Sequence, residues 1–360
     1  MDQLKLSISS KFYMSSFIRL SFFPIAIAFT WISFSALNLK GTDGNIDLLQ
    51  AGTSVLYERF NNYPIHCGAN PDIKDCIDSA LESSRDKVVL FGNSQLHAVN
   101  DISEDSELIA LRLHKKLIAE DEYAFTISYG NANFEEINWA FQEIYSNMEI
   151  KRIYIACVFD DMREVGLRPE MLEKHNGKEL NLNSDSKNNF LKEISFQDIS
   201  EEALKKIFTD SPAWNTRYEL KYQINVNLRA LRNKVFGITP ETKRKVLPYA
   251  YERNLGFLRD TLNTAFQNGI EVIVYIAPIL QDSNIPYDEE EYLKYKREIE
   301  SLAGIHNALF YNYESLVPND AWGLKQSTQL DSGLEKDYMH FTEAGHIILT
   351  SELLKSSINK

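Results

Sequence analysis

Two short motifs, far apart in the chain, carry the residue types of a serine nucleophile system. In the first, an apolar stretch ends at Gly92-Asn93 and is followed by Ser94. The second supplies a carboxylate, Asp337, and an imidazole, His340, on one short segment. A serine hydroxyl becomes nucleophilic when a histidine accepts its proton and a carboxylate orients that histidine. The sequence therefore predicts Ser94 as nucleophile, His340 as general base and Asp337 as the acid that orients it.

Each motif also has an ordinary structural interpretation. A serine that follows a strand often caps the next helix, and Asp and His at this spacing also occur by chance. His97, close to Ser94 in sequence, is expected to line the pocket wall, and His346 is expected to be structural. The catalytic interpretation therefore depends on both motifs being present together.

The segments around the motifs predict elements that would position them. Apolar runs bounded by turn residues predict β-strands, and amphipathic runs between them predict helices. Strands are expected at 87–91, 123–128, 152–158, 271–277 and 308–311, and helices at 106–119, 134–147, 250–267, 289–302 and 343–354. Such alternation is typical of a parallel sheet with helices on both faces. We therefore expect a three-layer α/β/α fold with a mostly parallel five-stranded sheet, Ser94 after its first strand, and the Asp-x-x-His motif in a loop before the last helix.

Taken together, the motifs resemble the sequence blocks of the SGNH (GDSL-like) hydrolase and acyltransferase superfamily. There, a serine block comes first and Asp-x-x-His comes last. The segment His340–His346 also resembles the superfamily's His-x-x-x-x-Gly-His ending. The likeness extends over about residues 86–357, although specific residues match only at the blocks. The first block reads Gly-Asn-Ser-Gln instead of Gly-Asp-Ser-Leu, which leaves the serine in place. The resemblance implies a flavodoxin-like SGNH fold and acyl-ester chemistry.

The resemblance also implies where an oxyanion would bind. Gly130, after the second predicted strand, corresponds to the glycine whose amide binds the oxyanion. The superfamily's third block, Gly-x-Asn-Asp, corresponds to Val158–Asp161, so Asp160 stands where an asparagine donor is usual. An ionised carboxylate at that position would repel an oxyanion. We therefore expect that Asn131 or Asn133 supplies the donor, or that Asp160 is turned away or protonated.

The N-terminal region predicts export. Residues 20–39 form an uncharged apolar run about as long as a bilayer is thick, with basic residues before it. We expect a cytoplasmic segment at 1–19, a transmembrane anchor at 20–39, an extracytoplasmic lead-in at 40–85 and the SGNH-like domain at 86–360. A cleaved signal peptide is the alternative. Cys67 and Cys76 either close a small disulfide loop, as an oxidising compartment favours, or stay unpaired, and Cys157 is expected to be buried packing.

Between the third and fourth predicted strands, residues 161–249 predict an insertion that is mainly helical. Its aromatic residues, among them Trp214, Tyr218 and Tyr222, either form a small core or stack on sugar rings. The net charge of −13 argues against a nucleic-acid partner. We found no metal-ligand cluster and no phosphate-binding loop, so no metal and no cofactor is predicted.

These observations predict an extracytoplasmic serine esterase or O-acyltransferase that acts through a Ser94 acyl-enzyme on an acylated cell-envelope glycan or polymer. Tethered, exported members of the superfamily include DltD-type and alginate-acetylation-type proteins. By that resemblance, a polytopic membrane acyltransferase is an expected partner. The alternative is an SGNH-like scaffold that binds or assembles an envelope complex without catalysis, which the aspartate at position 160 favours.

Overall fold

The computed structural model describes residues 48–50, 52–68, 71–103, 105–169, 171–172, 231–239, 242–281, 285–327 and 334–358. The expected anchor at 20–39 and most of the expected insertion at 161–249, including Trp214, Tyr218 and Tyr222, lie outside these residues. Within the described ranges, no helix is both long enough and apolar enough to span a membrane. The sheet and the site below belong to one compact unit formed by residues 46–181 and 232–360.

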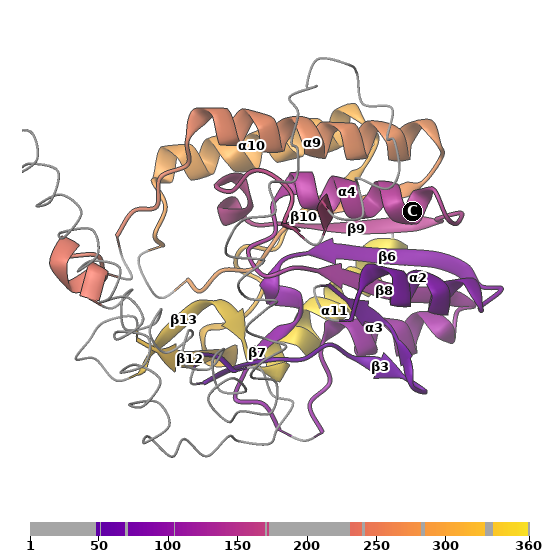
Figure 1. The fold of residues 1–360 in the computed structure, drawn as a ribbon, viewed down its shortest axis with the longest axis horizontal. Coiled ribbons are helices and arrows are strands. Elements are labelled where there is room, and N and C mark those ends of the chain that lie inside the picture. Colours follow the sequence, from indigo (N-terminus) through magenta and orange to yellow (C-terminus); the bar gives the residue numbers. More distant parts are fainter. Residues whose placement is uncertain are drawn as a thin grey trace, which may run out of the picture. The chain divides into compact units, whose positions relative to one another are not determined.

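A parallel sheet of six strands forms the centre of this unit (Figure 1). Its strands lie in the order β11–β10–β9–β6–β8–β5. Their bounds are Leu309–Asn312 (β11), Glu271–Ile276 (β10), Arg152–Cys157 (β9), Asp86–Gly92 (β6), Glu122–Ser128 (β8) and His66–Cys67 (β5). The α/β class, the parallel sheet and the five expected strands are confirmed. The count of five was wrong, because β5 adds a sixth strand beside β8. A two-residue strand is too short to leave a periodic pattern in the sequence.

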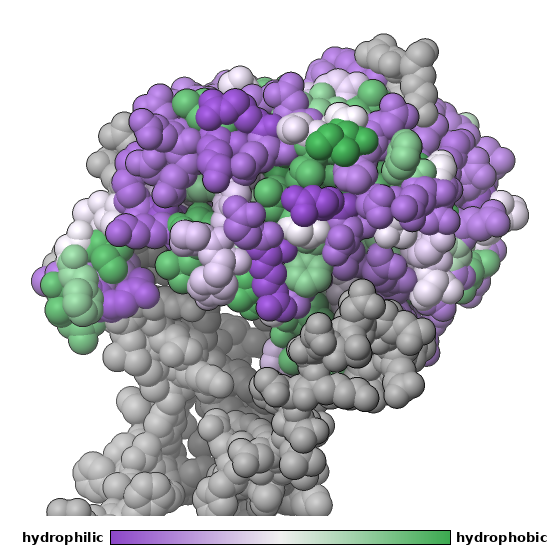
Figure 2. Space-filling model, turned by 90° about the horizontal axis from the view of Figure 1, so that it is seen from above, coloured by the Kyte–Doolittle hydropathy of each residue, from purple (hydrophilic) through white to green (hydrophobic). Residues whose placement is uncertain are grey.

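Helices cover both faces of the sheet (Figure 1). On one face lie α4 (Phe134–Tyr145), α9 (Pro248–Gln267) and α10 (Glu289–Ile305), and on the other lie α3 (Ile109–Ile118) and α11 (Glu343–Ile358). The central strands β6, β8 and β9 are almost fully buried between these layers, which explains their continuous apolar runs. Seen from the side of α9 and α10, the surface is mainly hydrophilic (Figure 2), as expected for helices that form an outer layer.

The structure adds several short strands that the sequence did not predict. An antiparallel sheet is formed by β1 (Leu48–Gln50), β2 (Thr53–Val55) and β7 (Ala98–Asn100). A hairpin is formed by β12 (Trp322–Gln326) and β13 (Leu334–Phe341), and another by β3 (Arg59–Phe60) and β4 (Tyr63–Pro64). The Asp-x-x-His motif therefore lies on β13, and the expectation that it occupies a loop was wrong.

The segment before residue 86 joins the sheet through β5, and a disulfide within the segment ties β5 to a helix. Cys67 at the end of β5 is bonded to Cys76 in α2 (Ile73–Leu81), with a Cα–Cα distance of 6.1 Å. Of the two alternatives for these cysteines, the structure shows the disulfide. Cys157, at the end of β9, is a buried free thiol, as expected for packing. The lead-in residues thus contribute β5 and α2 directly to the α/β unit.

Candidate active site

The turn after β6 presents Ser94 at the carboxyl edge of the sheet. Ser94 is the first residue of a short 3-10 helix, η1 (Ser94–Leu96). A Cβ on Gly92 would lie 2.7 Å from the Leu96 side chain and 3.0 Å from the Ala156 Cβ, so a larger residue here would force these buried side chains to shift. The residue that caps η1 is Asn93, whose Oδ1 accepts a hydrogen bond from the Gln95 amide at 3.0 Å. The Ser94 hydroxyl is therefore not used as a helix cap.

The position of β6 in the sheet gives Ser94 its setting. The chain passes from β6 to β8 on one side and then returns to β9 on the other side of β6. Ligands of open α/β sheets bind at such a switch point, beyond the carboxyl ends of the strands. Ser94 therefore lies where a substrate crevice is expected.

The hairpin β12–β13 brings the acid and the base to this edge. The register shifts between the Trp322–Phe341 and Leu324–Lys336 pairs, so residues 337–340 bulge from the ladder. The Asp337 carboxylate accepts hydrogen bonds from the backbone amide of Met339 at 3.0 Å and of His340 at 3.2 Å. This local turn explains how an acid and a base three residues apart can face each other on a strand.

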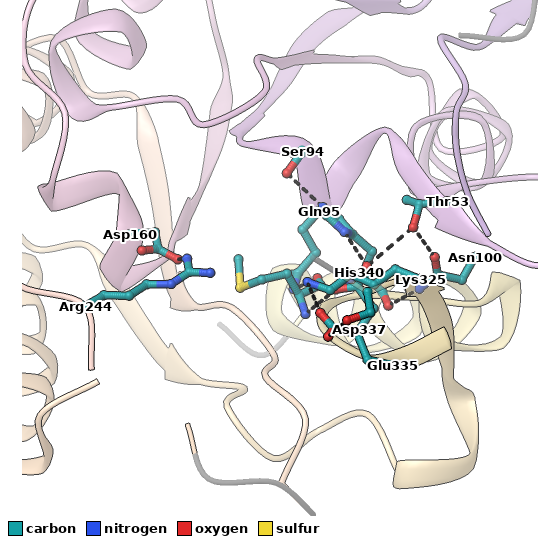
Figure 3. A network of polar contacts seen from close by, with 12 residues as sticks. Thr53, Ser94, Gln95, Asn100, Asp160, Arg244, Lys325, Glu335, Asp337 and His340 are labelled. Carbon is teal, nitrogen blue, oxygen red and sulfur yellow. Dashed lines mark hydrogen bonds and ion pairs between the residues drawn. The ribbon is translucent and has the colours of Figure 1, made fainter. Parts of the chain in front are cut away.

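Asp337, His340 and Ser94 form a continuous hydrogen-bonded chain (Figure 3). Asp337 Oδ2 lies 2.8 Å from His340 Nδ1, and His340 Nε2 lies 2.9 Å from Ser94 Oγ. When Nδ1–H donates to the carboxylate, Nε2 is left as an acceptor for the serine O–H. This is the geometry that a general base needs to take the proton of Ser94.

The surroundings of Asp337 keep it ionised. Its side chain is 1 % exposed, and burial by itself would raise its pKa. The charge and hydrogen bond of His340, together with Lys325 and the Met339 amide, outweigh burial and hold the pKa below its usual value. Lys325 Nζ lies 4.0 Å from Asp337 Oδ1. A carboxylate that stays charged can stabilise an imidazolium on His340.

Two side chains that sequence reasoning missed support His340 from the neighbouring sheet. Asn100 of β7 donates from Nδ2 to the His340 carbonyl at 2.7 Å (Figure 3). Thr53 of β2 donates its hydroxyl proton to Asn100 Oδ1 at 2.6 Å. Their strands are only three residues long, so no sequence pattern marked them.

A third missed residue, Gln95, connects the serine turn to its surroundings. Gln95 Nε2 donates to the carbonyl of Pro278, after β10, and to the carbonyl of Met339, both at 2.8 Å. The side chain is 1 % exposed. Gln95 stands where the superfamily motif has leucine, and this departure from the motif was the one signal that could have identified it.

Asp161 is the fourth missed residue, and it joins the ends of β6 and β9. Asn93 Nδ2 donates to Asp161 Oδ1 at 2.9 Å, and the Val158 amide donates to Oδ2 at 3.0 Å. Burial raises the pKa of this carboxyl well above its usual value. Asp161 therefore fixes Asn93, which in turn caps the helix that begins with Ser94.

Of the residues expected to bind the oxyanion, Gly130 and Asn131 are exposed and Asn133 is buried. Gly130 follows β8, whose Ser128 pairs with Gly92, and is exposed at the same edge as Ser94. Asn131 is exposed and has a left-handed backbone, with φ of 51°. Asn133 caps α4 with its Oδ1 and donates its Nδ2 to the Gly166 carbonyl at 3.0 Å. The side-chain amide of Asn133 is therefore already used in hydrogen bonds within the protein.

Asp160, in the superfamily's asparagine position, is turned toward cations (Figure 3). Its carboxylate forms an ion pair with Arg244 and accepts hydrogen bonds from Arg163 at 3.2 Å and from the Tyr287 hydroxyl at 3.1 Å. The structure thus shows a carboxylate that is paired with cations, and which of the expected alternatives holds for the oxyanion stays a prediction. The charge of Asp160 is compensated, which removes the electrostatic objection to an oxyanion nearby.

Buried histidines lie beneath the serine turn. His97 Nδ1 and His66 Nε2 each lie 2.7 Å from the Ser128 hydroxyl, and Tyr57 stacks on His97 with ring centroids 5.1 Å apart. Burial lowers the pKa of His97 to about 3, so its ring is neutral. His346 is also buried, edge-on to Phe341. These rings support the turn from inside the fold.

Comparisons with known proteins gave structural similarities only. No family model matched the sequence, and neither did any curated protein. Among solved structures, an acylhydrolase candidate from Bacteroides fragilis aligns over 79% of this chain and 93% of its own, with 12% identity and a TM-score of 0.39. A GDSL-like lipase from Bacteroides thetaiotaomicron aligns over 79% of this chain and 96% of its own, with 13% identity and a TM-score of 0.38. An acetylxylan esterase from Geobacillus stearothermophilus aligns over 76% of this chain and 94% of its own, with 11% identity and a TM-score of 0.39.

These values are too low to assign the chain to a family. The functional conclusion therefore depends on the geometry of Ser94, His340 and Asp337.

Proposed function

We propose that this protein is a serine esterase or O-acyltransferase that works through an acyl-enzyme on Ser94. One observation carries this proposal: the hydrogen-bonded chain from Ser94 Oγ through His340 to Asp337, with links of 2.9 and 2.8 Å. The three groups come from β13 and from the turn after β6, and they meet at the switch point of the sheet. Such a chain activates serine toward acyl carbonyls.

The mechanism follows from these positions. Ser94 Oγ attacks the acyl carbonyl while its proton moves to His340 Nε2, and Asp337 stabilises the resulting imidazolium. When the tetrahedral intermediate collapses, the C–O bond to the leaving alcohol breaks and His340 returns the proton to that oxygen. Water or a second hydroxyl then attacks the acyl-enzyme, with His340 as base, and Ser94 is regenerated. Hydrolysis and transfer differ only in this acceptor.

For the oxyanion, we propose the backbone amides of Ser94 and Gly130, with the exposed Asn131 as a further donor. Gly130 is suited to this role because a Cβ placed on it would meet no atom within 4 Å, which leaves open space at the edge of the sheet. Backbone amides at such an edge can stabilise developing negative charge without reorganising. Asp160 is not included, since its carboxylate is held by Arg244, Arg163 and Tyr287.

We further propose that the enzyme is exported and acts on an acylated glycan or polymer of the cell envelope. The uncharged run at 20–39 and the disulfide between Cys67 and Cys76 support an extracytoplasmic location. A membrane anchor at 20–39 is part of this proposal because of the same apolar run. A polytopic acyltransferase partner is part of it by resemblance alone.

Ester turnover by the full-length protein tests the proposal. We expect release of acetate from 4-nitrophenyl acetate and from acetylated oligosaccharides, and we expect Ser94→Ala to abolish it. Ser351→Ala, which changes an exposed serine on α11, is the matched control and should retain activity. If wild type and Ser94→Ala were equally inactive on every ester while both were folded, the non-catalytic scaffold would be favoured. Adding unacetylated oligosaccharide and measuring acetylated product separates transfer from hydrolysis.

A further inference from the structure

A run of three basic residues borders the proposed active site of an otherwise acidic chain. The chain carries a net charge of −13, yet residues 243–245 read Lys-Arg-Lys. The run lies just before α9, and its backbone is fixed by a hydrogen bond of 2.7 Å from the Arg244 amide to the Pro286 carbonyl. A local excess of positive charge in such a chain needs an explanation beyond solubility.

Arg244 is held in a defined position beside the acid and base. It forms an ion pair with Asp160, and its guanidinium lies over the ring of Tyr338, 5.0 Å from the centroid. Tyr338 directly follows Asp337 in β13. In Figure 3 the guanidinium end of Arg244 faces the side on which Ser94 and His340 lie. Arg244 thus packs against the residue that directly follows Asp337 in β13.

The guanidinium is only partly used by the protein. Nη1 contacts Asp160, while Nε and Nη2 make no hydrogen bond to any described residue. The Arg244 side chain is 33% exposed, so part of it is open to a ligand. A planar guanidinium with free N–H groups matches the geometry of a carboxylate or a phosphate.

The charges around Arg244 do not cancel. Asp160 is shared between Arg244 and Arg163. Lys243 Nζ donates to the carbonyls of Ile285 and Tyr287, and within the described ranges neither Lys243 nor Lys245 forms an ion pair. A cavity of about 300 Å³ adjoins Lys243, and its wall includes Tyr287, Lys296, Glu289 and Glu314. The cavity wall itself is balanced, with Lys243 and Lys296 against Glu289 and Glu314. The excess of positive charge lies beside it, where Arg244 and Arg163 share the single carboxylate of Asp160.

We propose that Arg244 and Lys243 form a binding subsite for an anionic group, a carboxylate or a phosphate, on the ester substrate. This inference rests on the proposed esterase or acyltransferase function of Ser94. Asp160 is here a positioning residue, because it directs Arg244 instead of contacting an oxyanion. The substrate class is then an acylated polyanion, and the anionic group lies on the Asp160 side of the scissile ester.

Three acetyl esters of similar size test the subsite with the full-length protein: an acetylated neutral xylo-oligosaccharide, an acetylated oligouronate and an acetylated glycerol-phosphate oligomer. We expect wild type to have a higher kcat/KM for one or both anionic esters than for the neutral ester. The anionic ester with the higher kcat/KM shows whether the subsite binds a carboxylate or a phosphate. Arg244→Gln should lower kcat/KM for the preferred anionic ester by about 10- to 100-fold, mainly through KM, as expected for a lost charge-assisted hydrogen bond. Arg244→Lys and Lys243→Gln should each lower kcat/KM for that ester by a smaller factor.

Arg259→Gln is the matched control, because Arg259 is exposed on α9 and forms no ion pair with a described residue. It should leave the ratio of anionic to neutral turnover unchanged. The subsite would be ruled out if wild type showed no anionic preference, or if Arg244→Gln lowered turnover of neutral and anionic esters equally. Loss of fold is checked by thermal melting, and Asp160 keeps Arg163 and Tyr287 as partners in the variant.

Failure of the proposed function would look different. If no ester is turned over, calorimetric titration with the deacetylated oligouronate and the glycerol-phosphate oligomer still tests the subsite. Binding that Arg244→Gln weakens at least tenfold, and that Arg259→Gln does not, would support the anionic subsite. No binding of either oligomer would overturn it.

Discussion

The Gln95 side chain donates a 2.8 Å hydrogen bond to the carbonyl of Met339, the residue directly before His340. The same amide nitrogen donates to Pro278 at 2.8 Å. One side chain on the serine turn therefore fixes the distance between the nucleophile and the strand that carries the base. The reaction rate is sensitive to small displacements of the reacting groups. Loss of this contact should therefore lower kcat and leave substrate binding nearly unchanged.

Gln95→Met, which keeps the side-chain length but removes the donor, should lower kcat by about 10- to 100-fold with little change in KM. The unfolding free energy should also fall, by about 1–3 kcal/mol, because the carbonyls of Pro278 and Met339 lose their donor while only one unpartnered oxygen, Gln95 Oε1, is removed. Steady-state kinetics and denaturant unfolding of both forms check this, with the exposed Gln267→Met on α9 as control. Unchanged kcat in Gln95→Met would show that the contact has no positioning role.

The Asn93–Asp161 pair predicts a rescue by exchange of the two residues. Asn93→Asp would place two carboxyl groups opposite each other where a 2.9 Å hydrogen bond now exists. We expect it to lower the unfolding free energy by about 1–3 kcal/mol and to reduce activity, because a buried hydrogen bond is replaced by a repulsive or protonated pair. The double variant Asn93→Asp/Asp161→Asn restores every hydrogen bond, including that from the Val158 amide.

The double variant should therefore regain most of the stability and activity that Asn93→Asp loses. The double-mutant cycle consists of wild type, both single variants and the double variant. Each protein is measured by denaturant titration and by ester turnover. Additive losses in the double variant would contradict the inferred pairing.

The disulfide predicts a redox-dependent stability. Cys67 and Cys76 are nine residues apart, and on the chain-entropy model a loop of this size contributes about 2–3 kcal/mol. Cys67→Ala/Cys76→Ala should lower the unfolding free energy by that amount, and a reductant should destabilise wild type but not the double variant. Thermal melting with and without reductant measures both effects. A wild-type melting curve that reductant leaves unchanged would argue against the bond.

The buried histidines predict a component of stability that is lost in acid. Burial lowers the pKa of His346 to about 3, while the unfolded-state value is near 6.5. Between these values the unfolded chain binds a proton that the folded chain does not, so stability falls as pH decreases from 6.5 toward 3. The slope is about 1.4 kcal/mol per pH unit for each such histidine. His97 has the same shift, and burial also lowers the pKa of His66.

Two buried acids act in the opposite direction. Burial raises the pKa of Glu58 to about 7 and that of Asp161 well above its usual value. The test therefore compares wild type with His346→Leu. Between pH 4 and 6, the unfolding free energy of the variant should fall less steeply with decreasing pH, by about 1.4 kcal/mol per pH unit, which corresponds to one proton. Parallel curves for wild type and His346→Leu would contradict the prediction.

The sequence predicted those parts of the fold that are long and periodic. The strands around Val88 and Ile153, and the helices that alternate with them, were predictable because runs of five or more apolar residues are diagnostic of buried strands. The short strands of the site were not, since β2, β5 and β7 carry too few residues to show a period. The helical insertion expected at 161–249 lies mostly outside the described residues and stays a prediction.

The same contrast holds for the site. Ser94, Asp337 and His340 were predictable from residue type and motif, and the structure places them within hydrogen-bonding distance of each other. The residues that hold them were not predictable, because support by Asn100 or Gln95 depends on contacts between segments far apart in the chain. Asp160 shows the limit most clearly. Its type predicted a conflict with an oxyanion, but only the structure reveals that Arg244 takes up its charge.

Labelling of the full-length protein with a fluorophosphonate probe, followed by peptide mass spectrometry, tests the central claim most directly. The account predicts one covalent adduct on Ser94, absent in Ser94→Ala and slowed by at least about 100-fold in His340→Ala, because the base activates the serine. The control Ser351→Ala should label as wild type does. A folded wild-type protein that forms no adduct on Ser94, or that labels equally fast without His340, would contradict the proposed nucleophile.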